Sequence, residues 1–315
     1  MLQRRSQLRA ASDAGFTLIE VMVTTMIMLT VSGVVITGVL NMTQLNATTT
    51  NRSAMFAGVR NATALLQQEV GQAGRISLPA PVTVNTAAIA TATSLEVSSV
   101  AGMFVGEYIV VGTGDTGETV AITAINGTTL TVGTAFENKH DVAEPVTVQG
   151  AFWAGVVPPH LSDGTDNPDG STGSVLKIFG DINGSGKMVY VEYTCDLNAG
   201  VLYRNQMDFD AAKKEDPGVE QILVENVQQN PDKTDCFTYQ EQTIAAKVFV
   251  IGVAITLTVQ SEDRDPITQE FQKESKALLN VSPRNVFNAW LLYSQLMENR
   301  VQPTPDATAK LMPAN

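Results

Sequence analysis

The most apolar stretch of the chain lies near its N-terminus. Residues 16–40 contain a single charged side chain, Glu20. A helix over these 25 residues is about 37 Å long, enough to cross the roughly 30 Å hydrocarbon core of a bilayer. Arg4, Arg5 and Arg9 precede the stretch. Because positive residues stay on the cytoplasmic side, we expect the N-terminus in the cytoplasm and the bulk of the chain to be exported.

Beyond this segment, the spacing of apolar residues predicts that the same helix continues. No proline interrupts residues 41–75. Apolar side chains recur at spacings of four, three and four, in one stripe that a sheet can cover: Met55, Val59, Ala62 and Leu66. Glycines and prolines between residues 71 and 81 end the pattern. We therefore expect a long helix within residues 16–80.

Residues 82–150 change to short runs of strand-forming residues. These runs lie at 94–97, 107–111, 118–125, 129–132 and 145–148. Asn126-Gly127 between two of them is a strong hairpin signal. Several short strands in so short a segment predict an inserted small β-barrel or β-sandwich module. The alternative is an elaborated loop of the domain that follows.

Residues 151–285 predict a second β-rich domain, which makes the expected fold class α+β. Strand patterns lie at 175–179, 188–193, 201–204, 221–227, 237–240 and 247–259. Residues 286–299 predict a short amphipathic helix with Phe287, Trp290 and Leu291 along one side. That side packs on its own domain or docks a partner. The prolines at 303 and 305 predict a flexible tail through residue 315.

The composition disfavours nucleic-acid binding and catalysis. Twenty basic and 32 acidic side chains give a net charge of -12, whereas phosphate binding needs a basic face. Two cysteines and two histidines provide little material for a metal centre or a Cys/His enzyme. His140 and His160 have no nucleophile motif near them. We therefore expect no enzymatic activity, no nucleic-acid partner and no cofactor, apart from the calcium ion considered below.

A processing motif joins the basic leader to the apolar helix. Gly15-Phe16-Thr17-Leu18-Ile19-Glu20 resembles the prepilin peptidase site of type IV pilins and type II secretion pseudopilins. The resemblance implies removal of residues 1–15 after Gly15, methylation of the new N-terminal Phe16, and retention of Glu20 for assembly. A carboxylate in a membrane helix is costly without a partner, and the Phe16 amine of a neighbouring subunit would be one. The alternative is a plain signal anchor.

The order of motifs in the second β-rich region is similar to that of W-type minor pilins and J-type pseudopilins. It includes Val-Tyr-Val-Glu-Tyr at 189–193, Leu-Tyr-Arg at 202–204 and Pro-Arg-Asn at 283–285. The resemblance covers roughly residues 1–80 and 151–288, and the inserted module and the tail depart from it. It implies an antiparallel pilin head behind the long helix.

The same resemblance implies a structural role. The chain would sit in the inner membrane with its head in the periplasm, then at the tip of a pilus or pseudopilus at the cell surface. Its partners would be other major and minor pilins or pseudopilins, the prepilin peptidase and the inner-membrane assembly platform. Three functions stay open: a pilus-priming minor pilin, a type II secretion pseudopilin, and a tip adhesin that uses residues 82–150.

Two further groups of residues carry candidate chemistry. Residues 181–192 have the spacing of an EF-hand loop, with oxygen ligands for Ca²⁺ at Asp181, Asn183, Ser185 and Glu192 and possible help from Asp166 and Asp169. The alternative is a plain hairpin turn, because the residues that follow alternate as in a strand. Cys195 and Cys236 lie in the part expected to be exported, where two cysteines more often pair than stay free. The alternative is two buried thiols.

Overall fold

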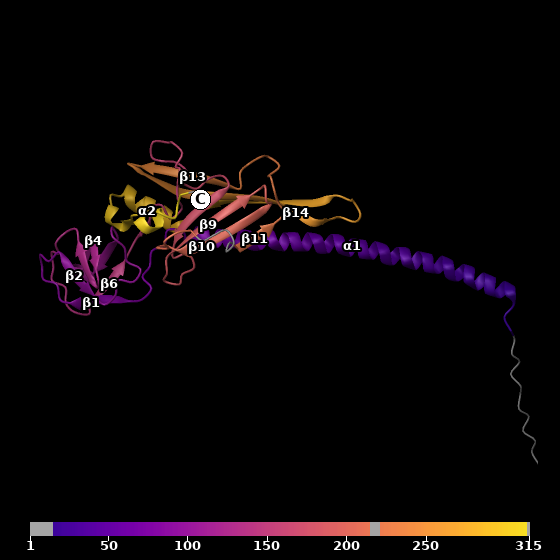
Figure 1. The fold of residues 1–315 in the computed structure, drawn as a ribbon, viewed down its shortest axis with the longest axis horizontal. Helices are drawn as coiled ribbons and strands as arrows, with labels where there is room; N and C mark the ends of the chain where they lie inside the picture. Colours follow the sequence, from indigo (N-terminus) through magenta and orange to yellow (C-terminus); the bar gives the residue numbers. More distant parts are fainter. Residues whose placement is uncertain (1–14, 215–220, 314–315) are drawn as a thin grey trace, which may run out of the picture.

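The N-terminal helix dominates the shape of the molecule. The computed structural model describes residues 15–214 and 221–313, with the backbone alone for 277–280. Helix α1 (Leu18–Gln72) runs without interruption for 55 residues, about 80 Å at 1.5 Å per residue. Its first half projects away from the rest of the protein, and its second half lies against β-sheets (Figure 1). The expected apolar stripe is confirmed, because Val59, Ala62 and Leu66 are buried.

The inserted module is a closed six-stranded barrel, at the opposite end of the molecule from the start of α1 (Figure 1). Its strands follow the order β1-β2-β5-β4-β3-β6. They are β1 (Val82–Thr86), β2 (Ser94–Val97), β3 (Tyr108–Val111), β4 (Glu118–Asn126), β5 (Thr129–Val132) and β6 (Pro145–Val148), with the short helix η1 (Gly114–Thr116) between β3 and β4. Asn126 pairs with Thr129 across the expected hairpin. Aliphatic side chains such as Ile109 and Leu130, together with Phe136, fill the interior.

Two antiparallel sheets form the head. One has the order β11-β10-β9-β8, from β8 (Val175–Gly180), β9 (Val189–Asp196), β10 (Val201–Asp208) and β11 (Gln221–Glu225). The other joins β12 (Val227–Gln228), β13 (Phe237–Ile244), β14 (Lys247–Arg264) and β15 (Phe271–Val281). Residues of α1 and of both sheets share one apolar core, in which Leu66, Val191 and Ile255 are fully buried.

The predicted strand at 221–227 is divided into two strands, because the chain changes sheets within it. Asn226 has a φ of +59°, a left-handed conformation that asparagine tolerates better than most residues. The preceding strand β11 pairs with β10, while β12 pairs with β14 in the other sheet. Asn226 is therefore the corner at which the chain crosses from one sheet to the other.

Strands β14 and β15 form a long hairpin that extends along α1 (Figure 1). The prediction ended the first strand at residue 259, but β14 continues to Arg264. Strand β15 was not predicted at all. Its run Gln272-Lys273-Glu274-Ser275-Lys276 is polar and lies at the margin of the sheet, where few side chains are buried. The polar composition hides the strand, since strand signals depend mainly on apolar alternation.

The C-terminal segment is packed rather than flexible, so the expectation of a flexible tail is wrong. Helix α2 (Arg284–Ser294) is followed by η3 (Glu298–Arg300), β16 (Val301–Gln302) and α3 (Asp306–Ala309). Strand β16 pairs in parallel with β7 (Ala151–Phe152). Leu311 and Met312 then join a core between the head and the barrel that also holds Phe104 and Phe179. Burial of these apolar side chains holds the tail in spite of its prolines.

Candidate functional site

The expected processing site lies at the free end of α1. Gly15, Phe16 and Thr17 precede the helix in non-helical conformation, and all three are exposed. The Thr17 hydroxyl accepts a hydrogen bond from the Glu20 amide at 3.4 Å and caps the helix. Apart from its chain neighbours, no atom of the described residues lies within 4 Å of a Cβ placed on Gly15. An enzyme can therefore reach the bond after Gly15; the leader residues 1–14 lie outside the described residues.

Glu20 lies in the first turn of α1, where a negative charge interacts favourably with the helix N-terminus. The helix is long and apolar enough to cross a membrane, and its most apolar stretch is not buried within the molecule. Apolar side chains from Leu18 to Leu45 are exposed on it. This part of the helix therefore needs an apolar surrounding that the chain itself does not supply.

A buried ion pair fixes the second half of α1 to the head. The Arg204 guanidinium, on β10, donates to both Glu69 carboxylate oxygens, at 2.7 and 3.1 Å. The Tyr193 hydroxyl, on β9, donates to the same carboxylate. Burial, reinforced by the charge of Glu69, raises the pKa of the Tyr193 phenol and keeps it protonated as a donor. This ion pair was not predicted from the sequence, although Glu69 is a charged residue three positions after Leu66 in the apolar stripe of α1.

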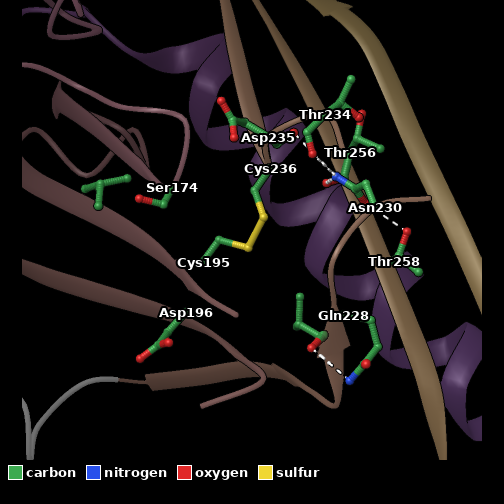
Figure 2. Close-up of a disulfide and its surroundings, with 12 residues drawn as sticks. Ser174, Cys195, Asp196, Gln228, Asn230, Thr234, Asp235, Cys236, Thr256 and Thr258 are labelled. Atoms are coloured by element: carbon green, nitrogen blue, oxygen red, sulfur yellow. Dashed lines mark hydrogen bonds between the residues drawn. A yellow bond between two sulfur atoms is a disulfide. The ribbon is translucent and has the colours of Figure 1, made fainter. Parts of the chain in front are cut away.

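A disulfide joins the two sheets of the head. Cys195 at the end of β9 is bonded to Cys236 just before β13, with 6.4 Å between their Cα atoms (Figure 2). Both cysteines belong to the buried core. A cross-link that closes a loop of 41 residues stabilises a fold by about 3–4 kcal/mol through the lost entropy of the unfolded chain.

The loop before Cys236 is held by one buried asparagine. The Asn230 amide donates to the carbonyls of Thr234 and Thr256 at 2.8 and 3.2 Å, and its side-chain oxygen accepts from Thr258 at 2.8 Å (Figure 2). These bonds attach the loop to β14 and hold Cys236 opposite its partner.

The structure does not bring the four expected calcium ligands together. Glu192 stands opposite Lys177 in the β8–β9 register, whereas Asp181 follows Gly180, which stands opposite Val189. The Glu192 carboxylate accepts from Tyr190 and Lys214, each at 2.9 Å. The segment is the hairpin turn between β8 and β9, and the strand register separates Glu192 from Asp181.

One oxygen of the buried Asp181 carboxylate is bound by groups of the chain itself. It accepts from the Ser77 hydroxyl at 2.9 Å and from the Gly186 amide at 3.3 Å. The Arg75 guanidinium lies 3.7 Å away. Arg75 therefore supplies the positive charge in this loop. Within the described residues, no group of three or more His, Cys, Asp or Glu side chains is placed to hold a metal ion.

Three loops form the end of the barrel that faces away from the head. Strand β1 leads out of the head and β6 leads back in antiparallel, so loops 87–93, 112–117 and 133–144 lie at the far end. His140 belongs to the last of them, and its backbone pairs with Ala88 at 2.9 Å in both directions. Its two ring nitrogens face Glu144 at 2.9 Å and Glu118 at 3.4 Å. The buried His140 therefore joins loop 133–144 to loop 87–93 and to the start of β4.

The C-terminal strand ties the barrel to the head. The Gln302 side chain accepts from the Tyr108 amide at 2.9 Å and donates to the Tyr108 and Gln149 carbonyls at 2.8 and 2.9 Å. Further along, the Lys177 ammonium donates to the Met312 carbonyl at 2.6 Å. Residues 301–312 thus act as a strap across both parts.

Comparison with known proteins does not identify a family for this chain. No family model, no curated protein and no solved structure matches this chain. The processing motif at Gly15 and Phe16, and the exposed apolar half of α1, are therefore the observations on which a function is proposed.

Proposed function

We propose that the chain is a minor pilin of a type IV pilus, a structural subunit that primes assembly at or near the filament tip. The observation that best supports the proposal is the contrast between the two halves of α1. Its first half is apolar and exposed behind the Gly15-Phe16 motif, and its second half is locked into the head through Glu69. Such a helix suits a subunit that first sits in a membrane and then packs with other helices in a filament.

Each candidate residue has a role in this proposal. Prepilin peptidase cuts after Gly15, and the new N-terminus at Phe16 is methylated. Glu20 then pairs with the Phe16 amine of a neighbouring subunit, because a carboxylate in an apolar bundle requires an opposite charge. The head lies in the periplasm while the helix is in the inner membrane. The assembly platform and the other pilins are the partners, and no cofactor takes part.

The barrel favours the tip over the shaft of the filament. It lies at the end of the molecule remote from the start of α1 (Figure 1). In a helical shaft, a module at that end would meet the subunit stacked above it. The loops at its far end also favour a second candidate function, adhesion by the tip, because loops on a rigid scaffold are common binding surfaces.

A deletion strain tests the proposal. Electron microscopy should show loss of surface pili, while secreted enzymes still reach the medium. Intact pili with enzymes retained in the periplasm would instead indicate a type II secretion pseudopilin of the J type. Pili that are present but no longer attach to surfaces would indicate the adhesin.

A further inference from the structure

The hairpin of β14 and β15 reaches α1 close to the end of its exposed apolar half. Both strands contact α1, and the tip of the hairpin points toward the projecting half of the helix (Figure 1). The Thr268 and Ile267 amides lower the pKa of the Asp265 carboxyl at the tip, and the Thr48 side chain of α1 contributes to the same shift. The tip therefore lies at about the level of Thr48 on the helix.

The tip is a fixed turn that presents an apolar side chain. The Asp265 carboxylate accepts from the Ile267 and Thr268 amides at 2.7 and 3.1 Å. The Asp265 amide donates to the Glu270 carbonyl at 2.9 Å. The Ile267 side chain is nevertheless 54% exposed. The turn therefore directs an isoleucine into the surroundings of the protein rather than into a core.

The side chains beside Ile267 suit the surface of a bilayer. Phe271 is 39% exposed, and the Arg264 guanidinium lies 5.1 Å from the centre of its ring. Apolar side chains beside a long basic one are typical of segments that lie in a membrane interface. Glu262 and Asp263 near the end of β14 are also exposed. Burial of apolar surface, and not attraction to anionic lipid, would therefore drive the contact.

The length of α1 places the tip next to the lipid headgroups. The exposed apolar side chains of the helix are concentrated between Leu18 and Leu45. A hydrocarbon core that ends at residue 40 leaves Thr48 about 12 Å beyond its edge, and the headgroups fill about 5–7 Å of this distance. Side chains at the tip and the usual helix tilt of about 20° cover the rest.

We propose that the tip of the β14–β15 hairpin docks on the lipid headgroups of the inner membrane while α1 spans the bilayer, with Ile267 and Phe271 as its anchors. This inference rests on the proposed function in one point, the insertion of α1 in the membrane. The occupant is lipid because the bilayer that covers the apolar half of α1 ends near the level of the tip. The contact would orient the head before assembly, and it would be broken when the helix leaves the membrane for the filament.

Quenching by labelled lipids tests the contact in the full-length chain. Cys195 and Cys236 are bonded to each other, so Thr268→Cys supplies a single reactive thiol for a bimane fluorophore and keeps Ile267. In phosphatidylcholine vesicles, nitroxides on the headgroups should quench this fluorophore. Adding anionic lipid should not increase the quenching. No quenching at position 268, or quenching only with anionic lipid, would overturn the proposal.

Two further labelled positions calibrate the measurement. A fluorophore at Leu29→Cys, within the apolar half of α1, should be quenched by nitroxides deep in the acyl chains. A fluorophore at Ile89→Cys, in barrel loop 87–93 and 67% exposed, should not be quenched. Quenching at position 29 without quenching at 268 would overturn this inference alone. No quenching at either position would overturn the membrane insertion of α1 and with it the proposed function.

Substitution of Ile267 separates docking from proximity to the membrane. In the labelled chain, Ile267→Asp should remove most of the quenching at position 268 and leave the melting temperature unchanged, because the side chain is exposed. Ile267→Leu should preserve the quenching, and so should the matched control Ile89→Asp. Full quenching in Ile267→Asp would overturn the proposal. A photo-cross-linker at position 268 in intact cells should yield lipid adducts, and an adduct with another protein subunit instead would also overturn it.

Discussion

At the scale of single residues, helix α1 carries one carboxylate that is paired inside the fold and one that is exposed. Glu69 meets Arg204 and Tyr193 inside the head. Glu20, by contrast, is exposed on the projecting half of α1. A carboxylate that remains in so apolar a segment costs free energy in a membrane unless something neutralises it.

Replacing Glu20 by alanine tests its role in assembly. The Glu20→Ala chain should insert in the membrane as before, because the change makes the segment more apolar. It should be depleted from filaments, because the partner amine at Phe16 of the next subunit loses its counter-charge. Membrane fractionation and immunoblotting of sheared filaments measure the two effects. Normal incorporation of the variant into filaments would contradict a role of Glu20 in assembly.

Glu107 makes the stability of the barrel depend on pH. Its carboxyl is fully buried at the start of β3, and burial raises its pKa to about 8. The folded state therefore keeps a proton that the unfolded state releases above pH 4.5. Stability should fall as the pH rises from 4.5 to about 8, by at most about 1.4 kcal/mol per pH unit.

The Glu107→Gln variant checks this pH dependence, because glutamine has nearly the same shape and does not titrate. Its melting temperature should change less across this pH range and exceed that of the parent chain above pH 8. Parallel curves for the two proteins would show that Glu107 titrates in the folded state as it does in the unfolded state.

At the scale of elements, the junction of α1 with the head depends on the Glu69–Arg204 pair. Both side chains are nearly buried, at 8% and 12% exposed. Removing one partner leaves the other charge buried without compensation. Arg204→Met should therefore destabilise the head by about 3 kcal/mol, measured by urea unfolding. The double variant Glu69→Gln/Arg204→Met should recover part of this loss. If the double variant is no more stable than the single one, the buried charge is not the cause.

Elements with local signals could be predicted from the sequence. The apolar run at 16–40 predicts the helix, and Asn126-Gly127 predicts the β4–β5 hairpin at its observed position. The closure of the barrel was not predictable, because it depends on the pairing of β1 with both β2 and β6. Strand β15 and the corner at Asn226 were not predicted for the same reason. Both depend on pairing between distant strands rather than on local strand propensity.

Among the candidate site residues, the processing motif could be recognised because it is contiguous. The spacing of residues 181–192 could not separate a calcium loop from the observed hairpin turn, and the approach of Arg75 to Asp181 joins residues more than 100 positions apart. The Glu69 contact with Arg204 spans 135 residues. Contacts between residues so far apart in the sequence cannot be predicted from the local spacing of apolar and polar residues.

At the scale of the whole molecule, the C-terminal strap keeps the barrel in a fixed orientation. Gln302→Leu keeps the volume but leaves the backbone groups of Tyr108 and Gln149 without their partner. Unsatisfied buried groups cost about 1–3 kcal/mol each. The variant should be cut faster than the parent by protease in the connecting residues 76–82. Equal cleavage rates would show that apolar packing around Leu311 suffices to hold the barrel.

The order of parts along the molecule is compatible with the proposed function. The projecting half of α1 is at one end, the locked head lies in the middle, and the barrel is at the other end (Figure 1). In a filament whose α1 helices pack together, the barrel of such a subunit would lie farthest from the packed helices. This arrangement suits a filament tip, where no subunit lies above.

The measurement that tests the central claim most directly is the mass of the mature N-terminus. The chain would be purified from membranes of its own cells and its N-terminal peptide identified by mass spectrometry. We predict that it begins at Phe16 and carries one methyl group on the amine. A chain that still contains residues 1–15, or that is cut after the apolar stretch, would contradict the assignment to the pilin-like family.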